Sequence, residues 1–457
     1  MKTLKMMSAL FFCLSLVSCQ KYLDVKKNNS LVYISSATDC QRLLDNYSIM
    51  NTEYPSDAEN SSDDYYLTDG YDQQVQEDQS IYTWQSSAIR AGAVPQWQNP
   101  YLVAYHANLV METVEKLKGS TDPSILNPLR GAALFFRAYA FWQVAQLYAK
   151  PYNAATAGQD PGIPLRLTSD INDVSSRGTV QQTYDQMVKD LQEAAGLLPA
   201  TATISSRPSK GAVYAMLARV YLTMENYPAA LSNATAALQI NNKLIDFNTL
   251  DVNTESPFAR FNAEVYFHSL TNDITNPNST MLIDPTYAKV STDIVTSYKT
   301  DDLRKVIFLK NNGDGTFHFT GNYEPFAYMT LFNGLAVDEV YLTRAECYAR
   351  AGDAASAMSD LNTLLKSRWK TGKYVDMSAA NADDALAKVL VERRKELIMR
   401  STRWTDLRRL NKDPRFAVTL TRVVNGTTYT LPPNDLRYTL LIPNQVIMNS
   451  NLAQNPR

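Results

Sequence analysis

The stretch AVYAMLARVYLTMENYPAAL, residues 212–231, decides the fold of this chain. Alanines and aromatic residues recur in it at helical spacing, and the turn-forming letters ENYP interrupt them. The pattern returns in EVYLTRAECYARAGDAASAM, residues 339–358, at a constant offset that superposes Tyr214 on Tyr341. Small residues that let two helices approach closely, on either side of a turn, are typical of tetratricopeptide (TPR) repeats. We therefore expect at least two related helical hairpins.

A fainter copy of the pattern covers residues 132–142, which are apolar on nearly all sides. Such a helix should be packed on several sides, and we expect its partner to be a helix over residues 179–198. The sequence thus predicts a mostly α fold, a right-handed TPR-like solenoid of helical hairpins. Its helices should occupy about 97–240 and 336–410.

Two large loop-rich excursions interrupt the predicted helices, over about residues 30–95 and 242–335. The first is rich in Asp, Asn, Ser and Tyr, and its aromatic residues argue against disorder. The second contains NGDG at 312–315 between two apolar runs, which predicts short strands and a hairpin. Because loops that leave a repeat scaffold often gather on one face, we expect both on the ligand side. Residues 411–457 should form an irregular C-terminal segment.

The first residues predict export. Lys2 and Lys5 precede an apolar run, residues 10–17, that is too short to span a bilayer. The following letters place a small serine directly before Cys19, which resembles the lipobox of bacterial lipoproteins. A signal peptide over residues 1–18 would then be removed, and acyl chains on Cys19 would anchor the protein. An ordinary secretory signal with a chance cysteine is the alternative.

The composition of the chain argues against some classes of binding partner and favours others. A net charge of −2 over 457 residues offers no basic field for nucleic acid or anionic lipid. Apart from the leader and the anchor, Cys40 and Cys347 are the remaining cysteines, and the sequence leaves their pairing open. Cys347 lies in a helical apolar pattern and is expected to be a small core residue. The 27 tyrosines favour recognition surfaces, because each ring combines rigid contact area with a polar tip.

Further short motifs run in order along nearly the whole chain. They are CQKYLD at 19–24, Trp97 with Tyr101, Tyr105 and Asn108, RGTV at 177–180, RPSKGA at 207–212, ERRKEL at 392–397, Arg403-Trp404, Ile442-Pro443 and QNP at 454–456. This ordered set resembles the SusD/RagB family of outer-membrane lipoproteins. The letters MRST at 399–402 depart from the acidic residue and glycine that the family often has there, which should alter only a local surface.

The resemblance implies a binding protein that is lipid-anchored in the outer membrane and exposed on the cell surface. Such a protein captures oligosaccharides (glycans) and delivers them to a SusC-like TonB-dependent transporter, without catalysis and without a cofactor. One alternative is a peptide-capturing lipoprotein of the RagB type. Another is a TPR scaffold that binds only proteins. The sequence does not name the ligand.

A glycan-binding surface needs flat aromatic rings flanked by groups that hydrogen-bond to hydroxyls. The first excursion offers this mixture, and the second adds further tyrosines. The candidate ligand-binding residues of the first excursion are Asp64, Tyr65, Tyr66, Tyr71, Tyr82, Trp84 and Arg90, and those of the second, which are weaker, are Tyr287, Tyr323, Phe326 and Tyr328. The alternative for each ring is that it packs the excursion onto the helices.

Signatures of enzymes and metal sites are weak. The three histidines lie far apart without metal-ligand spacing, and NGDG lacks the later carboxylate of a calcium loop. The sequence contains no Gly-x-Ser-x-Gly elbow and no phosphate loop. We expect no enzyme and no metal, although two glycosidase carboxylates need not be near in sequence.

Two helix-borne motifs have structural interpretations. Trp97 and Trp404 lie in helical patterns and are expected in the core. In the motif ERRKE at 392–396, a charged helix face that pairs at i,i+3 or i,i+4 spacing is expected rather than a catalytic site; its residues are Glu392, Arg393, Arg394 and Glu396.

Overall fold

The computed structural model describes residues 34–457 except 53, 69, 94, 272–285 and 326–329. Within it, residues 36–457 form one unit that is mostly helical. The predicted signal peptide, the predicted lipidation site Cys19 and two of the weaker ligand candidates, Phe326 and Tyr328, lie outside the described residues. No helix in the described part of the chain is long and apolar enough to cross a membrane.

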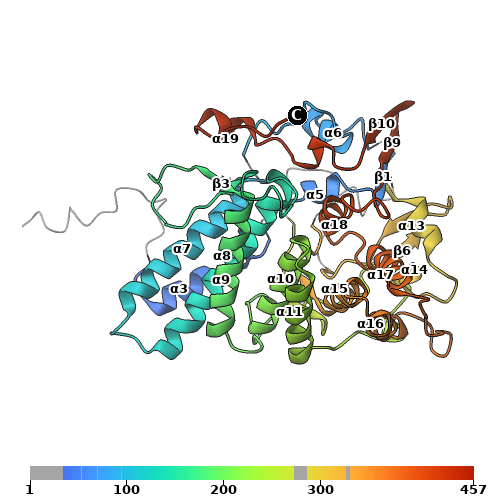
Figure 1. Cartoon of the computed structure of the whole chain (residues 1–457), viewed down its shortest axis with the longest axis horizontal. Coiled ribbons are helices and arrows are strands. Elements are labelled where there is room, and N and C mark those ends of the chain that lie inside the picture. Colours follow the sequence, from blue (N-terminus) through green and yellow to red (C-terminus); the bar gives the residue numbers. More distant parts are fainter. Residues whose placement is uncertain (1–33, 53, 69, 94, 272–285, 326–329) are drawn as a thin grey trace, which may run out of the picture. The chain divides into compact units, whose positions relative to one another are not determined.

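Three long helices pack side by side at one end of the unit (Figure 1). They are α7 (Gln98–Leu117), α8 (Pro123–Tyr148) and α9 (Val180–Leu197), and α8 contacts both of the others. All residues of α8 from 133 to 148 are buried, which confirms the prediction of a helix packed on several sides. A capping box on Thr179 starts α9, so the sequence placed this helix correctly.

The repeated segments form the two predicted helical hairpins. The first consists of α10 (Lys210–Thr223) and α11 (Tyr227–Ile240), and the second of α15 (Val337–Arg350) and α16 (Ala354–Lys366). Each pair packs together, and α11 also packs against α15, so the two hairpins meet. Buried alanines line these contacts, which is why the helices approach closely.

The turns of the two hairpins also correspond. Glu225 and Gly352 occupy equivalent positions in the two segments, and both have left-handed backbones, with φ of 58° and 89°. Glycine adopts this conformation without a steric penalty, whereas glutamate does so rarely. The sequence repeat is therefore also a repeat of backbone conformation. The second hairpin is followed by α17 (Ala382–Glu396), which packs on α15 and α16, and by α18 (Arg403–Leu410).

The excursions and the C-terminal segment carry short helices and strands. In the described residues the strands form antiparallel pairs, namely β1 (Tyr65–Leu67) with β5 (Ala288–Val290), β2 (Pro161–Pro164) with β3 (Arg177–Thr179), β4 (Val265–Phe267) with β8 (Leu335–Ala336), β6 (Leu309–Asn311) with β7 (Phe317–Phe319), and β9 (Leu420–Val424) with β10 (Thr427–Leu431). The shorter helices are α3 (Ala37–Leu44), α4 (Tyr47–Met50), α5 (Asp57–Asn60), α6 (Gln76–Tyr82), α13 (Thr292–Ser297), α14 (Arg304–Ile307), α19 (Asn444–Met448) and the 3₁₀ turns η2 (Phe247–Thr249) and η3 (Leu436–Tyr438).

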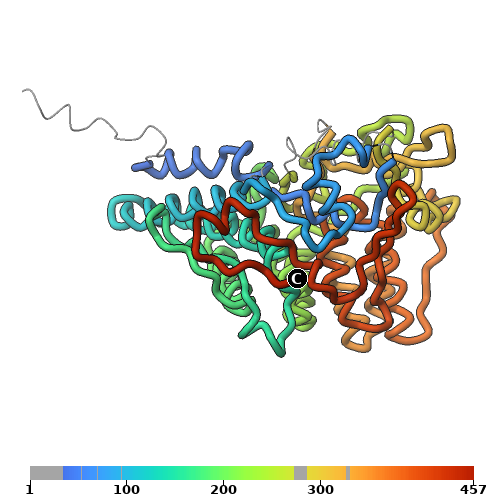
Figure 2. The backbone as a smooth tube through the Cα atoms, turned by 90° about the horizontal axis from the view of Figure 1, so that it is seen from above, coloured from blue at the N-terminus to red at the C-terminus, as the bar shows by residue number. Residues whose placement is uncertain are grey.

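The β1–β5 pair joins the two excursions, since β1 belongs to the first and β5 to the second. The predicted hairpin around 312–315 is confirmed, and its turn has Gly313 and Gly315 in left-handed conformations. The apolar run at 306–309 was expected to be its first strand, but residues 304–307 form α14 and β6 begins only at Leu309. In Figure 2 the C-terminal segment runs beside the end of the first excursion. The N–H of Asn444 donates to the carbonyl of Arg90 there.

The cysteines and tryptophans expected in the core are found there. Cys40 and Cys347 are buried and unpaired, so their pairing, which the sequence left open, does not occur. Trp97 and Trp404 are 7% and 0% exposed, which confirms their structural role.

Candidate functional site

Three of the predicted ligand-binding rings surround a buried arginine instead of facing solvent. Tyr65, Tyr82 and Trp84 are each at most 3% exposed. The guanidinium carbon of Arg422, on β9, lies 5.4, 3.6 and 4.5 Å from their ring centroids. Arg422 donates to three main-chain carbonyl oxygens, those of Asn60, Ser62 and Tyr82. We call this group the Arg422 stack. These rings pack the excursion onto the C-terminal hairpin and present no face to a ligand in this structure.

Trp84 illustrates how firmly the stack is held. Its backbone has φ of 51°, and its indole N–H donates to the carbonyl of Ser61 at 2.9 Å. Aromatic rings and an arginine in contact stabilise one another when they are shielded from water. The sequence interpretation of Trp84 as a ligand contact is replaced by a packing role.

Arg90 is also engaged inside the protein. Its guanidinium donates to both carboxylate oxygens of Asp57, at 2.6 and 3.1 Å, and to Asp78 at 2.6 Å. Burial raises the pKa of Asp78 to about 6, although Arg90 acts in the opposite direction. Arg90 is 8% exposed, so its role in this structure is to neutralise buried carboxylates rather than to bind a ligand.

A buried acidic cluster contains the next candidate, Asp64, which is 1% exposed. Arg394 donates to Asp64 at 3.0 Å, and Arg403 donates to both oxygens of Asp63, at 2.7 and 2.9 Å. Burial raises the pKa of Asp64 to about 6 despite Arg394. Burial, and then the charge of Asp64, raise the pKa of Glu59 to about 8. Asp64 is therefore part of an internal charge network and not of a ligand surface.

Replacing Glu59 by glutamine is expected to flatten the pH dependence of stability. Because the pKa of Glu59 is higher in the folded than in the unfolded chain, its favourable contribution is present at acid pH and is lost as the pH rises through about 8. Glutamine mimics the neutral carboxyl group. The difference in the free energy of unfolding between Glu59→Gln and the wild type should be about 1–2 kcal/mol more in favour of the variant at about pH 9 than at about pH 5.

Urea unfolding at the two pH values measures this difference. The control is Glu115→Gln, because Lys118 lowers the pKa of that exposed carboxyl group instead of raising it. An equal loss of stability in Glu59→Gln at both pH values would contradict the assignment.

The candidate from the second excursion, Tyr323, is fully buried. Its hydroxyl donates to a carboxylate oxygen of Glu264 at 2.7 Å, and the guanidinium carbon of Arg400 lies 4.4 Å from its ring centroid. The sequence prediction left strand packing open as the alternative for Tyr323, and the structure places it in the core.

The remaining candidates lie at the surface. Tyr66, Tyr71 and Tyr287 are half-buried, and Tyr429 on β10 joins them as a half-buried ring that sequence reasoning missed. We call these four residues the tyrosine surface. Tyr71 packs on the ring of Tyr82, with centroids 5.9 Å apart, so the Arg422 stack supports this surface from below.

Polar groups flank the tyrosine surface. Tyr66 stands opposite Lys289 in the β1–β5 ladder, and Lys289 pairs with Asp314 at 3.5 Å. On the other side, the amide of Asn425 donates to Asp72 at 2.8 Å. Burial, and then the charge of Asp314, raise the pKa of Tyr66, so its hydroxyl remains a donor at neutral pH. The surface thus combines apolar ring area with donors and acceptors.

The sequence contains a pattern that predicts the hairpin on which Tyr429 lies. Asn425-Gly426 separates two alternating runs, and this pair favours a two-residue hairpin turn. Both residues adopt left-handed backbones in the structure, with φ of 48° and 77°. The hairpin is readable from the sequence, but its position beside β1 is not (Figure 1).

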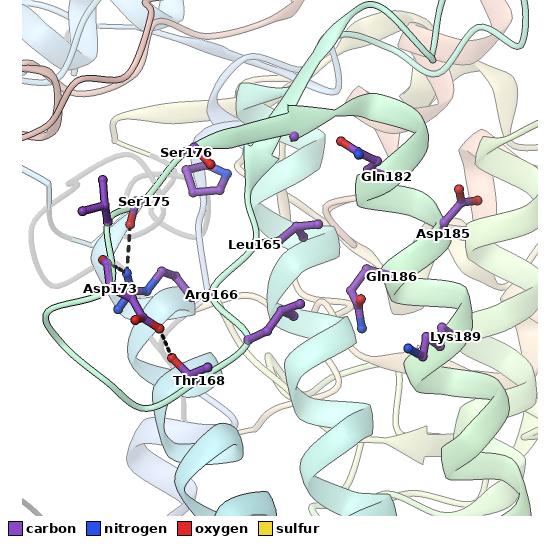
Figure 3. A pocket seen from close by; sticks show the side chains of 14 residues that line it. Leu165, Arg166, Thr168, Asp173, Ser175, Ser176, Gln182, Asp185, Gln186 and Lys189 are labelled. Atoms are coloured by element: carbon purple, nitrogen blue, oxygen red, sulfur yellow. Dashed lines mark hydrogen bonds between the residues drawn. The ribbon is translucent and has the colours of Figure 1, made fainter.

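A loop between β2 and β3 separates two hollows. The first, of about 420 Å³, lies between α7, this loop and α19, and we call it the α7 cleft. Its walls include Gln98, Tyr101, Tyr105, Arg166, Gln445 and Asn449. The second, of about 590 Å³, lies between this loop and α9, where Leu165 is on the loop side and Gln182, Gln186 and Lys189 are on α9 (Figure 3).

Arg166 lines both hollows and holds the loop in place. Its guanidinium donates to the hydroxyl of Ser175 at 3.2 Å and to the carbonyl oxygens of Asp170 and Asp173. Within residues 34–457, apart from the gaps given above, no group of three His, Cys, Asp or Glu side chains is arranged to hold a metal ion.

Comparison of the sequence with models of protein families identifies the family of this chain. A family model described as "Starch-binding associating with outer membrane" matches residues 21–222, and one described as "SusD family" matches residues 338–456. The chain belongs to the SusD/RagB family. The two matches cover the first excursion with the long helices, and the second hairpin with the C-terminal segment.

Individual SusD-like proteins are distant relatives. SusD-like protein P2 of Formosa agariphila is 23% identical in a 428-residue alignment that covers 79% of this chain and 79% of that protein. A SusD superfamily protein from Bacteroides vulgatus has a TM-score of 0.74 at 21% identity, over 93% of this chain and 99% of that one. A putative sugar binding protein from the same species has a TM-score of 0.74 at 20% identity, over 93% and 99%. A SusD superfamily protein from Bacteroides thetaiotaomicron has a TM-score of 0.73 at 22% identity, over 92% of this chain and 100% of that one. These likenesses show a common SusD fold.

Proposed function

We propose that this SusD-like protein is a cell-surface lipoprotein that captures oligosaccharides and delivers them to a SusC-like TonB-dependent outer-membrane transporter. The family description, which names starch binding and the outer membrane, supports the ligand class and the location. Acylation at Cys19 and removal of residues 1–18 belong to the proposal, as does the right-handed TPR-like stacking of the helical hairpins.

The observation that carries the proposal is the tyrosine surface. Three of its rings pack half-buried against one hydrophobic core cluster, namely Tyr71 from the first excursion, Tyr287 from the second and Tyr429 from the C-terminal hairpin. Tyr66, also half-buried, lies opposite Lys289 on the β1–β5 ladder. The faces of such rings can cover the C–H groups of a sugar, and the flanking Lys289, Asp314 and Asn425 can bond to its hydroxyls. Tyr71 rests on Tyr82 of the Arg422 stack, so this ring loses little side-chain freedom on binding. Binding of this kind needs no reaction and no cofactor.

Replacing Tyr66 or Tyr71 by alanine is expected to weaken oligosaccharide binding about tenfold for each ring. Loss of about 55 Å² of apolar contact corresponds to roughly 1.4 kcal/mol, which is this factor. The measurement is calorimetric titration of the chain without its first 19 residues, using the oligosaccharide that gives the strongest signal on a glycan array. The control is Tyr214→Ala, since Tyr214 is a half-buried tyrosine on α10, outside the tyrosine surface.

The same array with peptides separates the alternatives. Binding of peptides without oligosaccharides would replace the ligand class by that of a RagB-type protein. Binding of neither, with co-purification of the transporter, would favour a scaffold. Oligosaccharide binding that is unchanged in both tyrosine variants would remove the tyrosine surface from the proposal but not the function.

A further inference from the structure

We propose that the α7 cleft is a second carbohydrate-binding site, for a neutral sugar ring, separate from the tyrosine surface. This inference rests on the proposed oligosaccharide binding, and it assigns a role to residues that sequence reasoning placed only in a helix motif. The cleft shares none of its lining residues with the tyrosine surface.

One wall of the cleft is a rigid aromatic face. Tyr101 and Tyr105 are four residues apart on α7, so they lie on one side of the helix, one turn apart. The buried Trp97 backs Tyr101, with ring centroids 5.2 Å apart, and the hydroxyl of Tyr101 donates to the carbonyl of Pro164 at 2.9 Å. Tyr105 is half-buried in this wall. A sugar ring could stack on it without a change in the protein.

The opposite wall supplies uncharged polar groups. The N–H of Gln445 donates to the carbonyl of Ala91, and its side-chain oxygen accepts from the N–H of Ala93 at 3.1 Å. These bonds fix α19 against the chain that leads into α7 and leave the side-chain N–H groups of Gln445 without a hydrogen-bond acceptor among the described residues. Asn449 and Gln98 are exposed carboxamides at the same cleft. A carboxamide both donates and accepts, which matches sugar hydroxyls.

The size and charge of the cleft fit this ligand class. A volume of about 420 Å³ falls within the range of small-molecule sites, roughly 300–1,000 Å³. Among the described lining residues Arg166 alone carries a charge, and it is held by Ser175 and by main-chain carbonyls of its own loop. The lining offers no carboxylate for a cation. A neutral polyol with an apolar ring face is therefore the best match.

Two sites on one chain have a measurable consequence. An oligosaccharide that is too short to reach both should bind each site independently. One that is long enough to span them should gain affinity, because its second contact is intramolecular. Short neutral oligosaccharides therefore report on the α7 cleft most directly.

The test is calorimetric titration of the chain without its first 19 residues, using neutral gluco-, xylo- and manno-oligosaccharides from disaccharides to octasaccharides. We expect the wild-type protein to bind a short oligosaccharide at two sites. Tyr105→Ala should still bind at the tyrosine surface, whereas its binding at the α7 cleft should be at least tenfold weaker. Tyr105→Phe should retain both, since it keeps the ring. Asn449→Ala should weaken the same site, whereas Tyr66→Ala should weaken the other one.

Each failure has a distinct meaning. If Tyr105→Ala binds the oligosaccharide at two sites with the wild-type affinities and has an unchanged melting temperature, the second site is overturned and the proposed function stands. If the wild-type chain binds no oligosaccharide, the proposed function fails and the inference fails with it. If Tyr105→Ala keeps both sugar sites but no longer co-purifies with the transporter, the cleft docks a protein and the inference is wrong.

Discussion

Replacing Arg304 by methionine is expected to destabilise the fold by about 3–5 kcal/mol, because a buried network of carboxylates loses its central cation. Arg304 is fully buried and donates to Asp302 at 2.7 Å, Glu392 at 2.5 Å and Glu396 at 3.1 Å. Methionine fills similar space but leaves these charges without their main partner. Urea unfolding near neutral pH gives the difference in free energy directly.

The pH dependence supplies a second check on this prediction. Although burial acts in the opposite direction, Arg304 lowers the pKa of Asp302 and of Glu392. A lowered pKa contributes stability above the unfolded value, and this contribution is lost as the pH falls. The difference between Arg304→Met and the wild type should therefore shrink in acid.

The matched control is Arg415→Met, which removes an exposed arginine that pairs with Asp413 and Asp383. Surface ion pairs contribute little, so its unfolding curve should overlay that of the wild type. A loss below about 1 kcal/mol in Arg304→Met would show that the network relaxes or admits water.

Replacing Arg422 by methionine is expected to cost about 3 kcal/mol, from the lost cation–π contacts and from buried carbonyls left without a donor. The guanidinium carbon lies 3.6 Å from the ring centroid of Tyr82 and 4.5 Å from that of Trp84. Because Tyr71 packs on Tyr82, oligosaccharide binding should weaken together with stability.

The neighbouring Val423→Ala is the control, since Val423 is 67% exposed on the same strand and should change stability by less than about 0.5 kcal/mol. Thermal unfolding and glycan titration of the two variants test both parts of the prediction. Unchanged stability in Arg422→Met would mean that the rings hold their arrangement without the cation.

The helices were largely predictable because their patterns are local. The repeat of residues 212–231 in 339–358 gave both hairpins, and the helix expected over residues 179–198 corresponds to α9. The NGDG turn gave the β6–β7 hairpin. Each of these depends on residues within a few positions of one another, which a sequence displays directly.

The charged motif at 392–396 shows where local reasoning fails. The motif contains an i,i+3 ion pair, between Glu392 and Lys395 at 2.8 Å, although Lys395 was not among the residues expected to pair. The face is buried, however, and its strongest partners come from distant segments, such as Arg304 for Glu392 and Asp406 for Arg393. A pattern on one helix predicts charges but not the remote charges that allow their burial.

The candidate site was predictable in kind but not residue by residue. The sequence indicated the two excursions, and the β1–β5 ladder joins one to the other. The sequence could not show that Arg422, more than three hundred residues later in the chain, would contact Tyr82 and Trp84 in the core. Alternation along β1 puts Tyr65 inside and Tyr66 outside, but which face is inner depends on the partner strand.

The buried thiols have a practical consequence. Burial raises the pKa of Cys40 to about 11 and that of Cys347 to about 12, so neither supplies thiolate at physiological pH. Both will be slow toward alkylating reagents while the protein is folded. A cysteine introduced on the rim of either proposed sugar site can therefore receive a fluorophore or a spin label selectively, with the native residues left in place.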